Sequence, residues 1–178
     1  MNIKELKQEF ISNLSGIYPP EEVQSFFKLL IEKYLSLSSV EIVLKAEEEI
    51  SGNSIKTFRD AIKRLKKFEP IQYIIGETEF YGLILKVNSN VLIPRPETEE
   101  LVKWILDDAE EKRIDKKATY QKPLSLSILD IGTGSGCISI ALAHHLANAE
   151  ISGVDISKSA LKLARQNAIL NKAQVDFV

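Results

Sequence analysis

The sequence predicts an α/β protein with an amino-terminal helical bundle, a β-hairpin linker and the first half of a nucleotide-binding sheet. Three observations support this. The first 70 residues carry apolar side chains at helical spacing, the next 25 are rich in β-forming residues, and residues 125–155 pass from strand to helix to strand around three glycines. The expected domains are residues 1–70, the linker 71–95, and the sheet domain 96–178.

Composition narrows the class of protein. The 178 residues are 44% hydrophobic and 27% charged, with a net charge of −2, so no overall basic field indicates a nucleic-acid partner. One cysteine, Cys137, excludes an internal disulfide, and no cluster of Cys and His indicates a metal site. Residues 1–10 lack a signal-peptide core, and no apolar run approaches the ~20 residues of a membrane span. We therefore expect a cytoplasmic protein that is not membrane-bound.

Four helices are expected in the bundle. Gly16 should end the first helix, and Pro19 and Pro20 should start the second. Ser38 with Glu41 fits a capping box for the third, and Ser54 can cap the fourth. Each helix has apolar side chains on one face that should point into the core. In chain order these are, for the first helix, Ile3, Leu6, Phe10, Ile11 and Leu14; for the second, Val23, Phe26, Phe27, Leu30, Ile31 and Tyr34; for the third, Val40, Val43 and Leu44; and for the fourth, Ile55, Phe58, Ile62 and Leu65. Aromatic residues at this spacing are far more often core than ligand-stacking groups, so the bundle is expected to carry no chemistry.

The linker should form a β-hairpin. β-Forming residues run from Ile71 to Ile93 and are interrupted by the turn residues Asn88–Asn90, where we expect the turn. Pro94 and Pro96 then lead into a helix over Glu97–Arg113, whose first acids suit the helix dipole. Its inward residues are expected to be Leu101, Val102, Ile105, Leu106 and Ala109, with Trp104 packing beside them. A capped helix start explains the acids but not Arg95, which stands between two prolines.

The sheet domain opens with a strand over Leu126–Ile131 and the run Asp130-Ile-Gly132-Thr-Gly134-Ser-Gly136. A helix over 137–147 and a strand over 151–154 that ends on Asp155 should follow. Glycines let the backbone approach a ligand and adopt positive φ, and a carboxylate at a strand end can accept both hydroxyls of a ribose. A dinucleotide fingerprint would need glycine where Cys137 stands, and a P-loop would need a lysine after the last glycine. The flanking elements argue against a merely flexible loop.

Four runs along the chain resemble successive signatures of the HemK/PrmC type N5-glutamine methyltransferases. They are Glu79-Phe80-Tyr81-Gly82, the stretch V-L-I-P-R-P-E-T-E over 91–99, the D-x-G-T-G-S-G run over 130–136, and Val154-Asp155-Ile156-Ser157. The glycine run alone resembles motif I of many S-adenosylmethionine-dependent methyltransferases, whereas L-I-P-R-P-E-T-E is specific to this family. The resemblance covers the whole chain.

This resemblance implies a release-factor-binding helical domain followed by a class I methyltransferase (Rossmann-like) sheet. It implies transfer of a methyl group from S-adenosyl-L-methionine to the side-chain amide nitrogen of the glutamine in the GGQ motif of peptide chain release factors, with S-adenosyl-L-homocysteine as product. Release factors are then the expected partners, with no direct nucleic-acid contact.

The resemblance, together with position in the sheet, also implies the cofactor-binding residues. They are Asp130, Gly132, Thr133, Gly134, Ser135, Gly136, Asp155, Ile156, Arg95 and Thr98. The glycines should admit the methionyl part, beside the hydroxyls of Thr133 and Ser135. Asp130 should bind the α-amino group directly or through water, Asp155 the ribose, and Ile156 the adenine. Residues 94–98 should line the pocket from above. We expect no metal and no catalytic role for Cys137, His144 or His145.

One departure from the family concerns catalysis. The family's N-P-P-Y motif, which holds and orients the weakly nucleophilic target amide, occurs nowhere in these 178 residues and is expected beyond Val178. We therefore expect no catalytic residue in this chain and no activity from it alone. In the family's strand order the strand Leu126–Ile131 is central; here it would be an edge, and edges favour self-association with another copy.

Three other functions fit parts of the sequence. An NAD-dependent oxidoreductase would share the strand–glycine–helix–acid pattern, but Cys137 and the L-I-P-R-P-E-T-E run count against it. A DNA adenine methyltransferase or other N-methyltransferase would use a similar sheet, but its partner surface would be strongly basic, whereas this chain is mildly acidic. A non-enzymatic cofactor-binding module remains open for the 178 residues taken alone.

Overall fold

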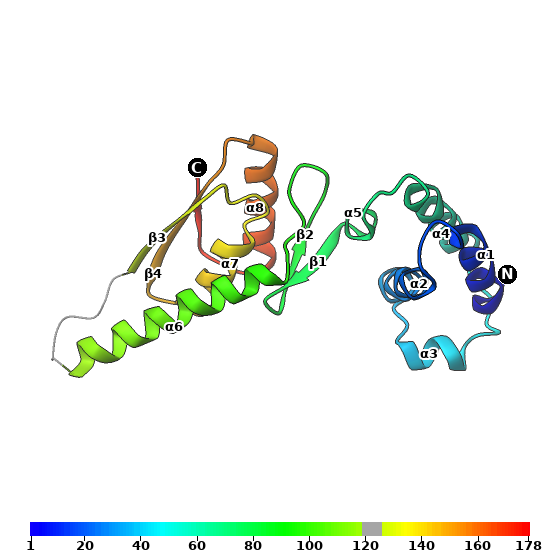
Figure 1. Cartoon of the computed structure of the whole chain (residues 1–178), viewed down its shortest axis with the longest axis horizontal. Coiled ribbons are helices and arrows are strands. Elements are labelled where there is room, and N and C mark those ends of the chain that lie inside the picture. The colour runs from blue at the N-terminus through cyan, green and yellow to red at the C-terminus, as the bar shows by residue number, and fades with distance from the viewer. Residues whose placement is uncertain (119–125) are drawn as a thin grey trace. The chain divides into compact units, whose positions relative to one another are not determined.

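The computed structural model describes residues 1–118 and 126–178; for residues 113–118 it describes the backbone only. The chain forms two compact units, Met1–Ile75 and Gly76–Val178. In Figure 1 the first unit contains helices α1 to α5, and the second contains strands β1 to β5 with helices α6 to α8. Within the described ranges, no helix combines the length and apolar character needed to cross a membrane.

The first unit consists of α1 (Ile3–Leu14), α2 (Pro20–Leu35), α3 (Ser39–Leu44), α4 (Gly52–Leu65) and α5 (Ile71–Ile75). A capping box starts α1, because Asn2 Oδ1 accepts from the Glu5 N–H at 2.8 Å and Glu5 Oε2 accepts from the Asn2 N–H at 3.0 Å. Gly16, with φ of +84°, follows the end of α1 as predicted. Pro20 occupies the first turn of α2, where its missing N–H costs nothing.

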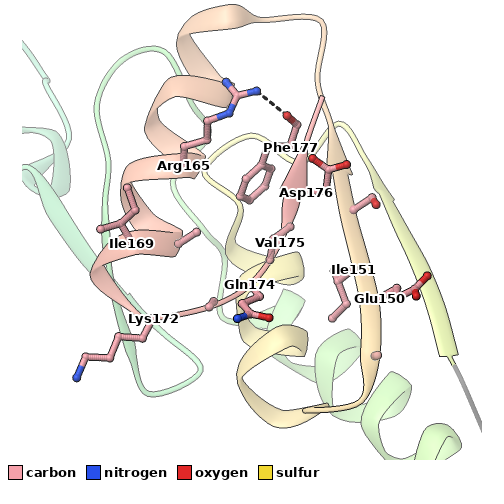
Figure 2. Close-up of a pocket in the computed structure, with 13 residues that line it drawn as sticks. Glu150, Ile151, Arg165, Ile169, Lys172, Gln174, Val175, Asp176 and Phe177 are labelled. Atoms are coloured by element: carbon pink, nitrogen blue, oxygen red, sulfur yellow. Dashed lines mark hydrogen bonds between the residues drawn. The ribbon is translucent and has the colours of Figure 1, made fainter.

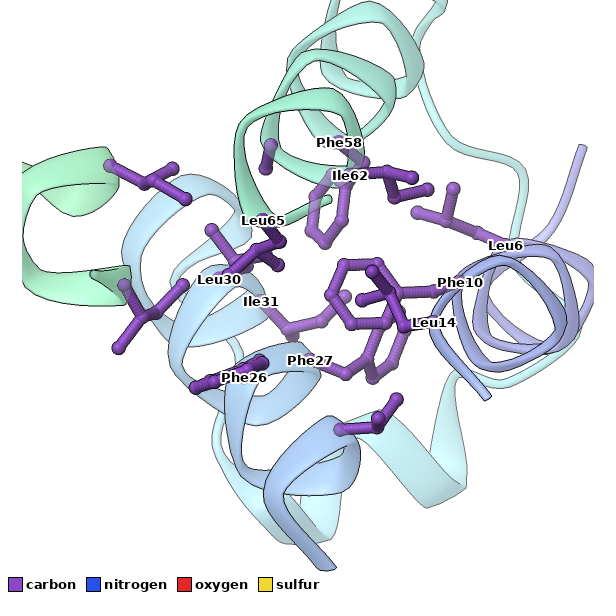
Figure 3. Close-up of a cluster of buried hydrophobic side chains, with 14 of the residues drawn as sticks. Leu6, Phe10, Leu14, Phe26, Phe27, Leu30, Ile31, Phe58, Ile62 and Leu65 are labelled. Atoms are coloured by element: carbon purple, nitrogen blue, oxygen red, sulfur yellow. The ribbon is translucent and has the colours of Figure 1, made fainter. Parts of the chain in front are cut away.

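The core of this unit is formed by the inward stripes of α1, α2 and α4 (Figure 3). The ring centroids of Phe10 and Phe27 lie 5.4 Å apart, and those of Phe27 and Phe58 lie 5.9 Å apart. All three rings are buried, as is Phe26. The prediction that these aromatic residues are core is confirmed, and pairs of this kind add packing energy beyond the area they bury.

Two predictions in this unit are wrong. Ser38 and Glu41 do form the expected capping box of α3, but Val40, Val43 and Leu44 are 67%, 74% and 78% exposed. The three share one helical face, yet it is Ile42, on another side of this short helix, that packs against the core. Helix α4 is capped by Ser51 rather than Ser54: Ser51 Oγ accepts from the Ser54 N–H at 3.2 Å, so the helix starts earlier.

The hairpin of the second unit comprises β1 (Glu77–Phe80) and β2 (Leu83–Lys86), which pair antiparallel with Phe80 opposite Leu83. The turn is therefore Tyr81-Gly82, with φ of +51° and +74°, as two-residue hairpin loops require. The predicted turn at Asn88–Asn90 is wrong, although those residues form a separate turn closed by the Val91 N–H and the Asn88 carbonyl. Residues 71–75, predicted as β, form α5 after Pro70, a helix-starting residue.

The main sheet has the parallel order β3–β4–β5, formed by β3 (Leu126–Ile131), β4 (Ala149–Val154) and β5 (Asp176–Phe177). Helix α7 (Cys137–His145) connects β3 to β4, and α8 (Lys158–Leu170) connects β4 to β5. Asp130 lies opposite Gly153 and Ile131 opposite Val154, so the two strands end together. This arrangement is the predicted partial Rossmann-like fold, with β3 at its predicted bounds.

Helices α7 and α8 pack with the sheet side chains Ile128, Ile151 and Phe177 in one hydrophobic cluster. The alternate side chains of β3, Leu129 and Ile131, are 57% and 79% exposed. The cluster therefore covers only the face of β3 that Ile128 shares, and the opposite face of this strand is exposed.

Phe177 fits closely against two glycines. A Cβ atom on Gly153 would lie 2.8 Å from two ring carbons of Phe177 and 3.0 Å from Thr133 Oγ1. On Gly136 it would lie 3.1 Å from Phe177 Cζ and 2.9 Å from Ile140 Cδ1. The ring therefore occupies the space that these glycines leave, and it draws the glycine loop, β4 and β5 together.

Helix α6 (Glu97–Ala118) is longer than the predicted 97–113. Val102 and Ala109 are buried as expected, and the former joins the cluster around α7. Leu101 is 42% exposed and Trp104 is 72% exposed. The predictions that Leu101 faces the core and that Trp104 packs beside it are therefore wrong. The apolar face of α6 is narrower than its sequence indicates.

A groove of about 1020 Å³ runs between β4, the second half of α8 and residues 173–177 (Figure 2). Arg165 crosses one end of it and donates to the Phe177 carbonyl oxygen. The residues that line the groove include neither the glycine loop nor Asp155. It is therefore a feature of the strand edges and not of the predicted cofactor site.

Candidate functional site

The glycine run forms a tight loop at the carboxyl ends of β3 and β4. Gly132, Gly134 and Gly136 have φ of 78°, 56° and 81°, a region that side chains with a Cβ seldom adopt. The N–H groups of Gly132 and Thr133 both donate to the Val154 carbonyl, at 2.8 and 3.0 Å. The loop is thereby anchored to the last residue of β4, directly before the predicted ribose-binding acid.

Asp155 joins this loop to the start of α8. Its Oδ2 accepts from the Gly134 N–H at 2.9 Å, and its Oδ1 accepts from the Ser157 N–H at 2.8 Å. The side chain is only partly buried. Because a carboxylate has about four acceptor positions, each oxygen can still accept a further hydroxyl proton. Asp155 and the glycine loop therefore lie together at the carboxyl ends of the strands, joined by backbone contacts that the sequence did not indicate.

The two loop hydroxyls face the protein rather than solvent. Thr133 Oγ1 donates to Asp130 Oδ2 at 2.7 Å and lies 2.9 Å from Ser139 Oγ; Thr133 and Ser139 are both buried. Ser135 is 2% exposed. In this structure, therefore, Asp130 and Thr133 hold the loop through each other, and neither hydroxyl is presented to a ligand.

The outer side of the loop is open. A Cβ atom on Gly132 would meet nothing within 4 Å, and one on Gly134 would meet only the Gly132 carbonyl oxygen at 3.9 Å. Ile156, next to Asp155, is fully exposed. An open backbone curve, a half-buried carboxylate and an exposed apolar side chain fit a ligand that carries both hydroxyls and an apolar ring. Gly136, by contrast, is buried, and a Cβ atom on it would lie 3.1 Å from Phe177 Cζ.

Arg95 and Thr98 lie at the beginning of α6, where the Thr98 N–H donates to the Arg95 carbonyl oxygen at 3.0 Å. Arg95 is exposed and Thr98 is partly buried. The neighbouring Glu99 connects this segment to the hairpin, because its Oε1 accepts from the Tyr81 N–H at 2.9 Å. The Tyr81 ring in turn stands edge-on to the His145 ring of α7, with centroids 5.3 Å apart.

Asn167 was missed by the sequence reasoning. It is fully buried in α8, and its Nδ2 donates to the carbonyl oxygens of Ser135 and Lys86, at 2.9 and 3.0 Å. Its Oδ1 accepts from the Lys86 N–H at 2.7 Å. One available signal was its helical spacing from the buried Ala160 and Ala164, which places a polar amide on an apolar stripe.

Cys137 begins α7 behind the loop. Burial raises the pKa of its thiol, an effect that a hydrogen bond with the Ser135 side chain partly opposes. A thiol in this state is a poor nucleophile. Across residues 1–118 and 126–178, no group of three or more His, Cys, Asp or Glu is arranged to hold a metal ion.

Comparison with protein families gives two matches. Residues 5–76 match the model of the PrmC N-terminal domain, and residues 111–178 match the model of ribosomal protein L11 methyltransferase (PrmA). The first match covers the helical unit and ends beside the boundary between the two units. The second includes the glycine loop, Asp155 and α8.

Two similar curated proteins have the same name. The chain is 42% identical over all 178 residues to a release factor glutamine methyltransferase of Flavobacterium psychrophilum, of which it spans 60%. It is also 47% identical over 131 residues to the protein of the same name from Lactococcus lactis. That match covers 74% of this chain and 44% of the relative. Among solved structures, the N-terminal domain of human METTL16 in complex with SAH matches 55% of this chain and 36% of its own, with 23% identity and a TM-score of 0.43.

Proposed function

The chain belongs to the family of release factor glutamine methyltransferases, and we propose that the protein it comes from has their activity. The proposed reaction transfers the methyl group of S-adenosyl-L-methionine to the side-chain amide nitrogen of the glutamine in the GGQ motif of peptide chain release factors. The observation that carries this proposal is the 42% identity over all 178 residues to a relative so named. The chain spans 60% of that relative, so the proposal concerns the intact protein.

The glycine loop and Asp155 are the proposed cofactor site. Asp155 is fixed by the Gly134 and Ser157 N–H groups and keeps acceptor positions for the two ribose hydroxyls. The exposed Ile156 would cover one face of the adenine, and the open backbone of Gly132 and Gly134 would lie against the methionyl part. When bound, S-adenosyl-L-methionine supplies an electrophilic methyl group on a sulfonium.

The remaining predicted site residues support this site in different ways. Asp130 and Thr133 hold the loop through their hydrogen bond, and the second oxygen of Asp130 remains the proposed partner of the cofactor's ammonium group. Ser135 and Gly136 belong to the buried side of the loop. Arg95 and Thr98 are proposed to line the pocket from the start of α6, which Glu99 fixes to the hairpin.

Release factors are the proposed partners of the helical unit. Its match to the PrmC N-terminal domain supports this, and so does its exposed apolar surface on α3, formed by Val40, Val43 and Leu44. Glu48 and Glu49, which follow α3, are exposed as well. An apolar centre beside acidic residues suits a protein partner better than a nucleic acid, whose phosphates acids repel. A substrate of this kind supports a cytoplasmic location for the enzyme.

A second copy of the chain is a further proposed partner of the 178 residues taken alone. The exposed Leu129 and Ile131 lie on β3, which is one of the two edge strands of the described sheet. Edge strands that carry apolar side chains tend to pair with other chains.

The proposed reaction is tested by mass spectrometry. Release factor is incubated with the intact protein and S-adenosyl-L-methionine, and the peptide that contains GGQ is sequenced by fragmentation. We expect a gain of one methyl group on that glutamine and none on a GGQ→GGA control. Methylation of another residue, or of DNA adenine in a parallel reaction but not of release factor, would overturn the proposal.

A further inference from the structure

We propose that Asn167 is a positioning residue that fixes the cofactor loop to the β-hairpin, so that cofactor affinity depends on a side chain that does not touch the cofactor. The inference rests on the proposed function. Its basis is one fully buried carboxamide whose hydrogen bonds reach two segments distant in the sequence, residue 86 on β2 and residue 135 in the loop.

The carboxamide is matched to its surroundings on both sides. The Lys86 N–H donates to its oxygen, while its NH₂ group donates to the carbonyls of Lys86 and Ser135. No other side chain of similar size offers an acceptor and two donors in one plane. An aspartate would place a carboxylate oxygen against two carbonyl oxygens, and an alanine would leave buried backbone groups without partners.

Its position makes the contact matter for the loop. Ser135 lies between Gly134, whose N–H donates to Asp155, and Gly136, whose N–H donates to the Thr133 carbonyl at 2.8 Å. Glycines have the widest choice of backbone conformations, so a loop of alternating glycines needs an external hold to keep one shape. Asp155 provides that hold directly after the end of β4, and Asn167 provides it from α8.

Asn171 offers a matched control one helical turn later. Its Nδ2 donates to the Ile84 carbonyl at 2.9 Å and to the Asn167 carbonyl at 2.9 Å. It therefore also ties α8 to β2, but none of its hydrogen bonds within the described residues reaches the glycine loop. If Asn167 served only to hold the hairpin on α8, the two asparagines would have similar effects.

The test compares Asn167→Asp and Asn171→Ala in the intact protein, with S-adenosyl-L-homocysteine as the probe in calorimetry. We expect Asn167→Asp to weaken binding about tenfold, the size of one lost net hydrogen bond, at a temperature where all variants are folded. We expect Asn171→Ala to leave binding within about twofold. Without any ligand, the Gly134 and Gly136 amides should exchange hydrogen faster in Asn167→Asp but not in Asn171→Ala.

A measurement on the unaltered protein covers the case in which Asn167→Asp does not fold. In nuclear magnetic resonance spectra, the two Asn167 side-chain amide protons should shift when S-adenosyl-L-homocysteine is added, together with the Gly134 amide. Shifts at Gly134 without any at Asn167, or equal affinities of folded Asn167→Asp and wild type, would overturn the inference. Failure of the unaltered protein to bind S-adenosyl-L-homocysteine would instead overturn the proposed function and, with it, the inference.

Discussion

The Glu99 carboxylate of α6 accepts a hydrogen bond from the Tyr81 backbone N–H at the tip of the β1–β2 hairpin, at 2.9 Å. Tyr81 has φ of +51°, an unfavourable conformation for a residue with a side chain. The carboxylate therefore compensates a strained turn, and it connects two of the sequence runs that resemble family signatures, Glu79–Gly82 and residues 91–99.

The first prediction concerns this contact. Glu99→Ala should lower the free energy of unfolding by about 1.5–3 kcal/mol, because a hydrogen bond to a charged group is lost. Glu100→Ala removes an equivalent acid from the same first turn of α6 and should cost only about 0.3–1 kcal/mol of dipole interaction. Urea denaturation of both variants measures the difference. Equal losses would mean that the Glu99–Tyr81 contact contributes nothing.

The second prediction concerns Asp155. Asp155→Ala should weaken binding of S-adenosyl-L-homocysteine by about 1–3 kcal/mol, through lost ribose contacts and through release of the Gly134 N–H. Asp176→Ala removes an exposed carboxylate from β5 of the same sheet and should leave affinity unchanged. Calorimetry on the intact protein decides, and an unaltered affinity of Asp155→Ala would refute the assignment.

The third prediction concerns the exposed surface of α3. Replacing Val43 and Leu44 together by Glu should raise KM for release factor about tenfold or more, because charges enter an apolar contact, with cofactor affinity unchanged. The control is Leu29→Glu, which places one glutamate at a 38% exposed apolar position of α2, and each α3 single variant, Val43→Glu or Leu44→Glu, is compared with it at equal charge. Steady-state methylation with purified release factor measures these variants. If the control raises KM as strongly as the α3 variant, α3 is not the contact.

The fourth prediction concerns Cys137. Burial raises the pKa of its thiol, so at pH 8 the folded protein should react with iodoacetamide about tenfold or more slowly than the urea-unfolded chain. The same raised pKa makes the free energy of unfolding depend on pH. The unfolded thiol loses its proton near pH 8.5 while the folded one keeps it, so the wild type should lose stability relative to Cys137→Ala as the pH rises above about 8.5. A difference that is constant between pH 7 and pH 10 would contradict this.

The fifth prediction concerns the exposed face of β3. The 178-residue chain should self-associate at micromolar concentration, and Ile131→Lys should shift it toward monomer by placing a charge at the edge. Ile169→Lys is the control, because Ile169 on α8 is also 79% exposed and lies away from β3. Sedimentation velocity separates the species. A wild-type chain that sediments as a monomer at this concentration would contradict the proposed self-association.

Local pattern was enough to predict much of the fold. Periodicity gave the buried stripes of α1 and α2, the Ser38–Glu41 spacing gave the cap of α3, and the apolar run ending at Ile131 gave β3. Each of these signals lies within a few residues of the structure it specifies. The glycine spacing and Asp155 likewise mark the ends of β3 and β4, which parallel pairing brings together.

The errors arose where the decisive partner is distant. The apolar face of α3 was identified, but a six-residue helix gives no local sign of which side meets the core. Asn88–Asn90 has stronger turn composition than Tyr81-Gly82, yet the register of β1 with β2 and the acceptor at Glu99 place the turn at the latter. Asn167 bonds to a strand 81 residues earlier, which no local window can reveal.

The fit of Phe177 against Gly153 makes these two positions interdependent in any redesign of the sheet. A methyl group on Gly153 collides with the ring at 2.8 Å, and removal of the ring alone leaves a cavity beside the loop that carries Gly136. A library that varies one of the two positions by itself should return almost only the original residue. A library that varies both can exchange volume between the strands, with a larger residue at 153 balanced by a smaller one at 177.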